Sequence, residues 1–556
     1  MSSSMVSVTI DGRTVEVEAG SNLVDASFKA GVQIPHYCYH PRLSVVGQCR
    51  MCLVKIEGVP KLQTGCTTQI TKDGMVVRID DDEVRAAQEG IMEFLLINHP
   101  LDCPICDQAG ECALQDYSFK HGQAFSRFSY EDKRTYPGKE RIPLGPNVVL
   151  NMNRCIQCTL CVRFTEEITQ TGELGFFQRG SRAEIGVFPG KELDNPLSTC
   201  VVDICPVGAL TSTQFRFAER VWYLDKTPSL CTGCDAGCNI TLEHRQGKIR
   251  RYKPRTNVEV NDYWMCDFGR TTFLSYEEDR LTTPQRRDAQ GQMRATTWDQ
   301  ALSSVYHFLI DGAAMGTVGI VARGAATTEE AYLLRLLADS LETPHRGVLR
   351  EPGPVRSIPN LNGGLTGREI TPNRRGALLA GLGPAGLGPE DSEASADSAT
   401  SPGEAEKILG GAVNGAHSVL LIFDGGRAGS DNALSRPAAL ESLRQAQTVV
   451  VLGWASTELT QVADIVLPIA THAETEGTLV NSQHRLQKFE RAFLPPSGVR
   501  TGVEALSDLV RRFRSDFAAQ TVSEVFDLMA GETPSLEGIR LAGLPAGGIQ
   551  LPVPPE

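Results

Sequence analysis

The residues of this chain best suited to chemistry are its sixteen cysteines, all of which lie between Cys38 and Cys266. Fifteen of them, together with one histidine, form four groups. The opening residues, MSSSMVSVTIDG, lack the basic and apolar regions of a secretory signal, so we expect a reducing compartment. Grouped cysteines in such a compartment indicate metal ligands rather than disulfides.

The first group is Cys38, Cys49, Cys52 and Cys66, with the spacing C-x10-C-x2-C-x13-C. Four thiolates from a long loop and a later strand suit a [2Fe-2S] cluster, although the spacing differs from the plant-type pattern. A structural zinc ion also accepts four cysteines. The spacing therefore predicts a [2Fe-2S] cluster and leaves zinc open.

The second group is His99, Cys103, Cys106 and Cys112. Its three cysteines would leave one metal position open, and His99 lies close enough in the sequence to fill it. A neutral imidazole in place of a thiolate makes a cluster less negative and raises its potential, as in Rieske centres. We expect a [4Fe-4S] cluster here, with a zinc site of three cysteines and one histidine as the alternative.

The third group is Cys155, Cys158 and Cys161 with the remote Cys205, which precedes a proline. The C-x2-C-x2-C run with a Cys-Pro is close to the bacterial-ferredoxin pattern of a [4Fe-4S] cluster. The fourth ligand must be Cys200 or Cys205, and the proline favours Cys205. We expect Cys200 to be a buried, inert thiol that packs as a small hydrophobic residue.

The fourth group is Cys231, Cys234, Cys238 and Cys266, with the spacing C-x2-C-x3-C-x27-C. Glycines at 233, 237 and 269 would let the backbone approach the sulfurs of a third [4Fe-4S] cluster. The four groups use fifteen of the sixteen cysteines and one histidine, which makes zinc a poor explanation of the whole set. We therefore expect one [2Fe-2S] and three [4Fe-4S] clusters.

A series of one-electron centres on one chain indicates electron conduction. Metabolic donors such as NADH give two electrons as hydride, so a flavin elsewhere must split them. The segment Gly381-x-Gly383-x-x-Gly386 formally matches a dinucleotide fingerprint, but Pro384 interrupts it and we interpret it as a loop. No Walker A motif, nucleophile elbow or hydrolytic triad is present, so we expect no catalytic residue on this chain.

The elements around the first two groups indicate a β-grasp ferredoxin domain. Residues 5 to 20 alternate apolar and polar on both sides of Asp11-Gly12, which predicts a hairpin. We expect Ser21 to cap a short helix that runs to Phe28 and ends at Gly31. The apolar spacing from Asp80 to Asn98 predicts a helix that leads into the second group.

The rear half alternates short apolar runs with helical patterns, as in a buried parallel sheet. Strands are predicted at 317–322, 418–423 and 448–453, and a helix at 433–447. Thr327 and Glu330 form the signature of a capping box at the start of a helix that runs to Leu341. Residues 381 to 406, rich in Gly, Pro, Ser, Ala and acids, predict a flexible acidic insert.

Charge and hydropathy exclude several classes of partner. The net charge is −13, with 54 Lys and Arg against 67 Asp and Glu, and no basic block occurs. Nucleic acid and anionic lipid are therefore not expected partners. No apolar run reaches the roughly 18 residues of a membrane span, so we expect a soluble chain.

The segments 37–54, 98–118, 153–164 and 203–211 resemble the large iron-sulfur subunit of respiratory NADH:quinone oxidoreductase, complex I. The resemblance implies that the first three groups relay electrons from the flavin subunit toward quinone-side subunits. It also implies three kinds of partner: a flavin- and NADH-binding subunit, a small [2Fe-2S] subunit, and quinone-side iron-sulfur subunits. We accordingly expect a cytoplasmic location at the inner face of the bacterial plasma membrane, with membrane contact only through the complex.

The fourth group and the segments 296–302 and 463–482 resemble molybdopterin oxidoreductases. That resemblance implies a fourth cluster off the main electron path. No cysteine follows Cys266 to bind a molybdenum ion, and the rear half is short, so we expect a scaffold without molybdopterin. The expected fold is a multidomain α+β front half followed by a shortened α/β molybdopterin-oxidoreductase-like domain. We expect five domains, at 1–82, 83–122, 123–220, 221–280 and 281–556.

Three other functions remain as alternatives. The catalytic subunit of an NAD-linked formate dehydrogenase, or of another molybdopterin oxidoreductase, would need a metal-binding cysteine or selenocysteine in the rear half. An iron-only hydrogenase would need four further cysteines. A scaffold or interaction protein whose cysteine groups bind structural zinc would be colourless, whereas a protein with iron-sulfur clusters would be brown.

Overall fold

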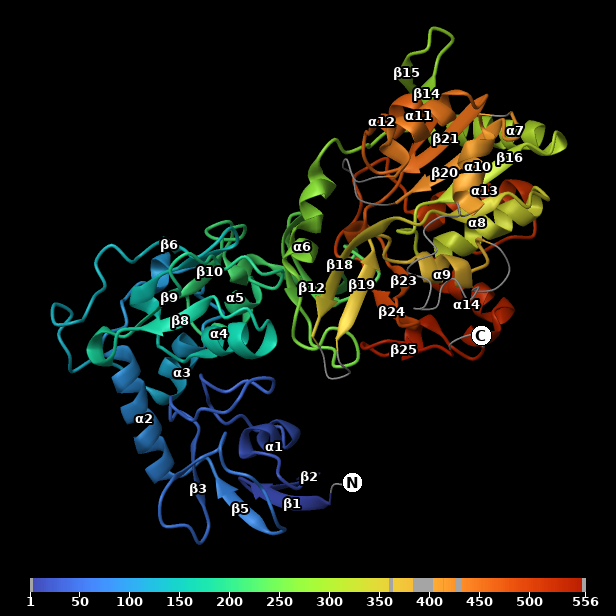
Figure 1. The fold of residues 1–556 in the computed structure, drawn as a ribbon. Coiled ribbons are helices and arrows are strands. Elements are labelled where there is room, and N and C mark those ends of the chain that lie inside the picture. The colour runs from blue at the N-terminus through green and yellow to red at the C-terminus, as the bar shows by residue number, and fades with distance from the viewer. Residues whose placement is uncertain (1–3, 360–363, 384–403, 414, 426–432, 553–556) are drawn as a thin grey trace. The chain divides into compact units, whose positions relative to one another are not determined.

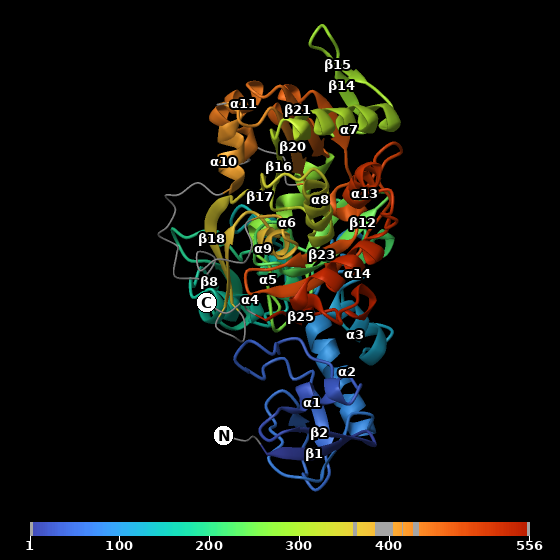
Figure 2. The ribbon, with the colours of Figure 1, turned by 90° about the vertical axis from the view of Figure 1, so that its right-hand side faces the viewer.

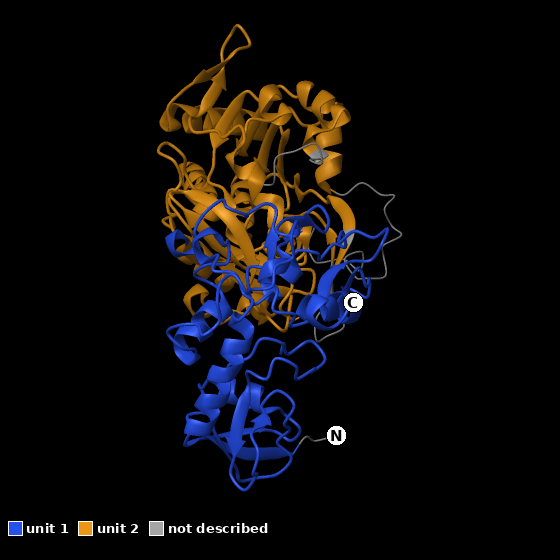
Figure 3. Cartoon of the chain, turned by 90° about the vertical axis from the view of Figure 1, so that its left-hand side faces the viewer, with its two compact units in different colours: residues 1–224 blue, residues 225–556 orange. Residues whose placement is uncertain are grey.

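The structure is a computed structural model that describes residues 4–359, 364–383, 404–413, 415–425 and 433–552. Gly386 of the fingerprint-like segment, and most of the predicted insert at 381–406, lie outside these residues. The chain forms two compact units, residues 1–224 and 225–556 (Figure 3), and each is described by itself. The five-domain division is finer than these units and stays a prediction. Among the described residues, no helix has the length and apolar character needed to cross a membrane.

The first unit opens with a five-stranded mixed sheet in the order β2-β1-β5-β3-β4 (Figure 1). Its strands are β1 Met5–Ile10, β2 Arg13–Glu18, β3 Leu53–Ile56, β4 Gln63–Thr64 and β5 Met75–Arg78. The predicted hairpin is confirmed, because β1 and β2 pair antiparallel around Asp11 and Gly12, whose φ angles of 42° and 79° suit a tight turn. Alternate residues such as Val8 and Ile10 are fully buried and form the core of this β-grasp fold.

The first helix, α1 Leu23–Lys29, begins one residue later than the sequence predicts. Asn22, not Ser21, is the N-cap, and its side-chain oxygen accepts a hydrogen bond from Asp25 N at 3.0 Å. The prediction of Ser21 was wrong because the backbone of that residue is already engaged: its carbonyl accepts from Ile70 N at 2.9 Å. The predicted left-handed Gly31 is confirmed, with φ of 66° after the C-cap Ala30.

The rest of the first unit consists of short elements between the cysteine groups. The predicted helix at 80–98 is confirmed as α2 Asp82–Leu96, capped by Asp81. The other helices are α3 Ala113–His121, α4 Leu160–Arg163 and α5 Cys200–Ile204. The strands β6 Ile142–Pro143, β7 Val148–Leu150 and β10 Leu210–Ser212 form one small sheet, and β8 Leu174–Phe177 pairs with β9 Glu184–Val187.

The second unit begins with an antiparallel sheet of β11 Asp225–Leu230, β12 Asn239–Arg245 and β13 Lys248–Pro254, followed by α6 Asp267–Thr271. A two-stranded hairpin, β18 Pro352–Ile358 and β19 Leu365–Glu369, comes later in the chain. A third small sheet contains β23 Gly477–Val480, β24 Arg485–Phe489 and β25 Ile549–Gln550.

The main sheet has seven strands in the order β15-β14-β22-β21-β20-β16-β17. Its strands are β14 Gln285–Arg287, β15 Met293–Ala295, β16 Val318–Ala322, β17 Arg346–Val348, β20 Val419–Asp424, β21 Thr448–Gly453 and β22 Ile465–Pro468. The strands from β22 to β17 are parallel, which confirms the predicted sheet. Their continuous apolar runs are buried on both faces, as parallel strands require.

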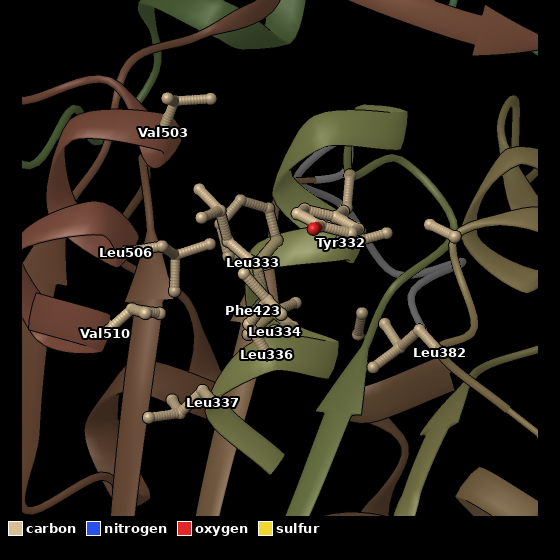
Figure 4. Close-up of a cluster of buried hydrophobic side chains, with 14 of the residues drawn as sticks. Tyr332, Leu333, Leu334, Leu336, Leu337, Leu382, Phe423, Val503, Leu506 and Val510 are labelled. Atoms are coloured by element: carbon tan, nitrogen blue, oxygen red, sulfur yellow. The ribbon is translucent and has the colours of Figure 1, made fainter. Parts of the chain in front are cut away.

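Helices cover both faces of this sheet (Figure 2). One face packs against α7 Trp298–Ala314, α8 Thr328–Ser340, α13 Gly502–Phe513 and α14 Val522–Glu532. The other packs against α10 Glu404–Gly411, α11 Pro437–Arg444 and α12 Glu458–Val462, and α9 Arg374–Leu379 follows β19 in the chain. Figure 4 shows leucines of α8 beside Leu506 and Val510 of α13, a buried contact that fixes α8 on the sheet.

Two helix predictions in this unit have different outcomes. The capping box of Thr327 and Glu330 is confirmed at the start of α8. The single helix predicted at 433–447 is wrong in length, because a 3-10 turn at Ala433–Ser435 is followed by a separate helix from Pro437 to Arg444. Pro437 has no N–H to continue the first turn, and it occupies the first position of the new helix, where proline is well tolerated.

Candidate metal centres

The first group forms two close pairs of thiols. The Sγ atoms of Cys38 and Cys49 lie 3.4 Å apart, and those of Cys52 and Cys66 are also 3.4 Å apart. The hydrogen bond within each pair lowers the pKa of Cys38 and Cys52 and raises the pKa of their partners. Two pairs of sulfurs match a [2Fe-2S] cluster, in which each iron takes two protein ligands.

The third group is shaped by an unusual loop. Gln157 and Thr159 both have positive φ, 56° and 68°, although neither is glycine. This backbone conformation costs roughly 1–2 kcal/mol per residue and is common at functional sites. It also lets Gln157 N donate to Cys155 Sγ at 3.3 Å. The strained loop therefore turns backbone and sulfur toward one another before helix α4 begins.

Cys205 is the fourth thiol that lies near this loop. Burial is the main cause that raises the pKa of Cys155, to about 12, and of Cys158 and Cys161, and the charge of Cys205 raises all three further. Such an effect requires proximity. Cys200, at the start of α5, is fully buried. The arrangement favours Cys205 over Cys200 as the fourth member of the group.

The second group contains the histidine. Burial, followed by the charges of Arg154 and Lys133, lowers the pKa of His99 to about 4. The imidazole is therefore neutral at physiological pH, which is the form that binds metals. Burial also raises the pKa of Cys106 and raises that of Cys112 to about 11, whereas Cys103 is exposed.

The second and third groups meet at the segment from Cys205 to Gly208. Burial is the main cause that raises the pKa of Cys205, and the charge of Cys106 raises it further. A Cβ atom at Gly208 would collide with Cys106 Sγ, so glycine is required there for the close approach. These contacts bring together two cysteine groups that are far apart in the sequence.

The first and third groups are joined by Arg163, whose side chain is only 6% exposed. Its guanidinium donates to the backbone carbonyl of Cys38 at 2.6 Å and to that of Cys158 at 3.5 Å. One buried cation thus holds the ligand loops of both groups. Arg163 was not predicted from the sequence, where its position immediately after the third group was the only available signal.

The fourth group lies in the second unit, where four buried thiols influence one another electrostatically. Gly233 N donates to Cys231 Sγ and Gly269 N to Cys266 Sγ, both at 3.4 Å. A Cβ at Gly269 would lie 2.9 Å from Cys231 Sγ, as the close approach predicted there requires. Gly237 instead provides a positive φ of 65°.

The hairpin of β18 and β19 covers the loop of the fourth group, a contact that the sequence did not suggest. A Cβ at Gly367 would lie 2.6 Å from Cys234 Sγ. The Asp235 carboxylate accepts from Arg368 N at 2.8 Å and from Glu369 N at 3.2 Å, and Asp235 N donates to Glu369 O at 3.0 Å. The hairpin is therefore fixed directly over the cysteine loop.

The donor sets fit iron-sulfur clusters. The cysteines are free thiols, and burial raises the pKa of most of them, so their thiolates need a positive metal beside them. Among the described residues, no three His, Cys, Asp or Glu side chains converge on a position for one metal ion. The ligands of a single metal ion must converge on one position. The thiolates of an iron-sulfur cluster each bind a different iron, so they need not converge in this way. The fold and its cysteine groups thus define an iron-sulfur protein that also contains an α/β domain.

Family models match five parts of the chain. They are a 2Fe-2S iron-sulfur cluster binding domain at residues 3–82, the NADH-ubiquinone oxidoreductase-G iron-sulfur binding region at 88–127, and the ferredoxin-like domain of NADH-quinone oxidoreductase subunit 3 at 145–211. The remaining two are the molybdopterin oxidoreductase Fe4S4 domain at 224–274 and molybdopterin oxidoreductase at 432–512. These matches confirm the predicted fold class.

Curated relatives confirm the resemblance to the large iron-sulfur subunit of complex I. The mitochondrial 78 kDa subunit of NADH-ubiquinone oxidoreductase from Neurospora crassa is 46% identical over 303 residues, 54% of this chain and 40% of that protein. The G subunit of NADH-quinone oxidoreductase from Streptomyces coelicolor is 40% identical over 59% of this chain and 39% of its own length. The corresponding protein from Rickettsia bellii is 42% identical, over 54% and 43%. The chain is therefore similar to this large iron-sulfur subunit, and it spans about two fifths of the length of these relatives.

Among solved structures, one chain of a NAD+-reducing [NiFe]-hydrogenase in the H2-reduced state is 28% identical. The match covers 39% of this chain and 91% of that one, with a TM-score of 0.35. A score of this size does not establish a common fold.

Proposed function

We propose that this chain is an electron-conducting subunit of an NADH:quinone oxidoreductase. The observation that carries the proposal is the linkage of three candidate centres within the first unit. Arg163 joins the loops of the first and third groups, and the segment from Cys205 to Gly208 joins the third and second. The third group is therefore the intermediate, and the order of transfer is first, third, second.

Sixteen residues would hold the clusters, which when bound supply one-electron redox chemistry. The [2Fe-2S] ligands are Cys38, Cys49, Cys52 and Cys66. The [4Fe-4S] ligands are His99, Cys103, Cys106 and Cys112 in the second group, Cys155, Cys158, Cys161 and Cys205 in the third, and Cys231, Cys234, Cys238 and Cys266 in the fourth. Buried thiols, backbone donors to sulfur and glycines at the sulfurs support this assignment.

The direction of transfer follows from the relatives' names, which describe oxidoreductases of NADH and quinone. Electrons would enter from a flavin- and NADH-binding subunit beside a small [2Fe-2S] subunit, and leave to quinone-side iron-sulfur subunits. The exposed Cys103 of the second group supports an exit at that end, because a partner's cluster could approach it closely. The chain would reach the inner face of the plasma membrane only through the assembled complex.

We propose that the fourth cluster lies off this path and that the rear domain binds no molybdopterin. No cysteine follows Cys266 in the sequence. One cavity in this unit, which lies between the loops of the fourth group and the ends of the parallel strands, has a volume of about 440 Å³. This volume is toward the lower end of the range for sites of single small ligands, and it supports the absence of two large pterin cofactors there.

The order of transfer is tested by removing the intermediate. In the complete complex carrying Cys161→Ser, NADH should reduce the [2Fe-2S] cluster of the first group but not the cluster of the second, as read by electron paramagnetic resonance (EPR). Dithionite should still reduce both, which shows that both clusters are present. The matched control is Cys200→Ser, which changes a cysteine outside the assigned ligand set. Reduction of the second cluster by NADH at the parental rate would contradict the order.

A further inference from the structure

A single buried arginine lies between the first and third cysteine groups. Arg163 is the last residue of α4. Its guanidinium donates to the backbone carbonyls of Cys38 and Ser44, which belong to the loop of the first group. It also donates to Cys158 O at 3.5 Å and to Thr159 Oγ1 at 3.0 Å, in the loop of the third group. Its positive charge is therefore enclosed by both loops.

Further contacts fix the loop of the first group beside this arginine. Glu167, four residues after Arg163, accepts a hydrogen bond from Ser44 N at 2.7 Å and another from the Ser44 hydroxyl. Gln48 of the same loop donates to Gln157 O of the third group. Ser44 is thus held at its carbonyl by Arg163 and at its amide by Glu167. The fold therefore fixes the position of the guanidinium with respect to both groups.

Within the described residues, the charge of Arg163 has no carboxylate partner. Every acceptor that it contacts is a neutral carbonyl or hydroxyl oxygen, and no ion pair includes it. Arg154, the buried arginine before the third group, differs because Asp102 accepts from its Nε at 3.1 Å and from its Nη2 at 2.9 Å. Buried charges are normally paired or lie beside a metal. The negative charges of the first and third groups are what balances Arg163.

The thiols of both groups respond to this charge. The hydrogen bond with Cys49 is the main cause that lowers the pKa of Cys38, to about 5, and the charge of Arg163 acts in the same direction. Burial raises the pKa of Cys158, and the charge of Arg163 opposes that rise. In both groups the arginine favours the more negative state of the sulfur. The same direction is expected for a cluster, because reduction makes a cluster more negative.

We propose that Arg163 is a positioning residue for electron transfer, whose permanent charge raises the reduction potentials of the first and third clusters together. A fixed cation stabilises the reduced form of each cluster, and a guanidinium keeps its charge at every physiological pH. One electron then passes from the reduced first cluster to the oxidised third cluster beside the same cation, with no bond formed and no proton moved. Because both potentials shift in one direction, Arg163 makes both clusters easier to reduce without opposing transfer between them.

This inference rests on the ligand assignment of the proposed function and goes beyond it by naming a residue that sets two potentials. The test is a potentiometric titration, followed by EPR, of the full chain with its iron content verified. The [2Fe-2S] signal reports on the first cluster, and the signal of the third is identified by its loss in Cys161→Ser.

Two variants of the arginine separate its charge from its hydrogen bonds. Arg163→Gln removes the charge, whereas Arg163→Lys keeps the charge but has fewer donors. Arg78→Gln is the matched control, because it removes the same charge from an exposed position on β5, where Arg78 pairs with Glu57. Ser44→Ala removes the hydroxyl that bonds to Glu167 and leaves the carbonyl that Arg163 holds, so it loosens the contact between the loops without a change of charge.

In Arg163→Gln, the ratio of reduced to oxidised cluster at the parental midpoint should fall by about tenfold or more for both the first and the third cluster, because a unit charge acts over several ångströms even near a protein surface. Tenfold corresponds to about 59 mV for a one-electron couple. Arg163→Lys, Ser44→Ala and Arg78→Gln should keep the parental potentials. The second cluster is an internal control, since none of the hydrogen bonds of Arg163 reaches its ligand loop.

Parental potentials of both clusters in Arg163→Gln, or a shift confined to one of them, would overturn the inference. Equal shifts in Arg163→Lys or Ser44→Ala would also overturn it, because the cause would then be the position of the loops rather than the charge. If Arg163→Gln loses iron, Arg163→Lys decides alone: parental potentials support the role of the charge, and lowered potentials contradict it. Absence of both clusters from the parent chain would instead contradict the ligand assignment of the proposed function, and this inference with it.

Discussion

At the scale of single residues, His99 differs from Cys106 and Cys112 of its group because its pKa is lowered rather than raised. Burial lowers the pKa of His99 to about 4, so the imidazole stays neutral without a metal. Burial raises the pKa of Cys106 and Cys112, whose thiolates need a metal nearby. The second group therefore brings one less negative charge to its cluster than the third.

Replacing His99 with Ala should alter or remove one [4Fe-4S] signal in EPR and leave the other clusters intact. Replacing it with Cys should restore a cluster with a lower potential, because a thiolate adds negative charge. His307→Ala, an exposed histidine of the second unit, is the control. A spectrum of His99→Ala identical to that of the parent would show that His99 is not a ligand.

The two cysteines at the ends of α5 give a second residue-level prediction. Cys205→Ser should abolish the [4Fe-4S] signal of the third group, since Cys205 is the thiol whose charge acts on Cys155, Cys158 and Cys161. Cys200→Ser should leave every cluster signal unchanged. Iron analysis and EPR of the two variants decide between them. If the [4Fe-4S] signal of the third group were lost in Cys200→Ser and kept in Cys205→Ser, Cys200 and not Cys205 would be the fourth ligand.

At the scale of elements, helix α8 buries two carboxyl groups in its first turn. Glu330 caps the helix through Thr327 N at 2.8 Å, and burial, together with the charge of Glu329, raises its pKa to about 7. A carboxyl whose pKa is raised in the folded state stabilises the fold below its unfolded pKa. It loses that contribution as the pH rises through the folded value.

The free energy of unfolding of the second unit should therefore fall by about 1 kcal/mol per such carboxyl between pH 6 and pH 8. Glu330→Gln keeps the capping box but cannot ionise, so it should flatten this dependence. Urea midpoints measured across the pH range check the prediction. Glu441→Gln, on the exposed face of α11, should retain the parental slope. An unchanged slope in Glu330→Gln would mean that Glu330 is ionised in the folded state.

The elements that the sequence predicted well are those in which one local interaction decides the outcome. The capping box at Thr327 and the turn at Asp11 and Gly12 depend only on neighbouring residues. The start of α1 at Asn22 depended on a distant bond between Ser21 and Ile70, which no local pattern reveals. The positive φ of Gln157 could not be predicted from the sequence either, because its strain is compensated only within the folded loop.

The same distinction applies to the candidate centres. Spacing predicts which cysteines group together, since ligands of one cluster come from short motifs, and that assignment stays a prediction. Spacing carried no information on the order of the groups, which follows from Arg163 and from the close approach of Gly208 to Cys106. The covering hairpin of β18 and β19 was also unpredictable, because its contact with Cys234 joins residues more than a hundred positions apart.

At the scale of the whole molecule, all sixteen cysteines lie in the first 266 residues, although they are distributed over two compact units. The first unit contains the three groups of the proposed electron path. The second contains the fourth group and an α/β domain that matches molybdopterin oxidoreductases. The central claim is therefore that four clusters, and no molybdenum, belong to this one chain.

The most direct test of that claim is the iron and molybdenum content per chain of anaerobically purified protein. One [2Fe-2S] and three [4Fe-4S] clusters predict about 14 irons, with no molybdenum or tungsten and with broad absorbance in the visible range. A value of about 10 irons would mean that one [4Fe-4S] site is unfilled. A colourless, zinc-containing protein, or stoichiometric molybdenum or tungsten, would contradict the account.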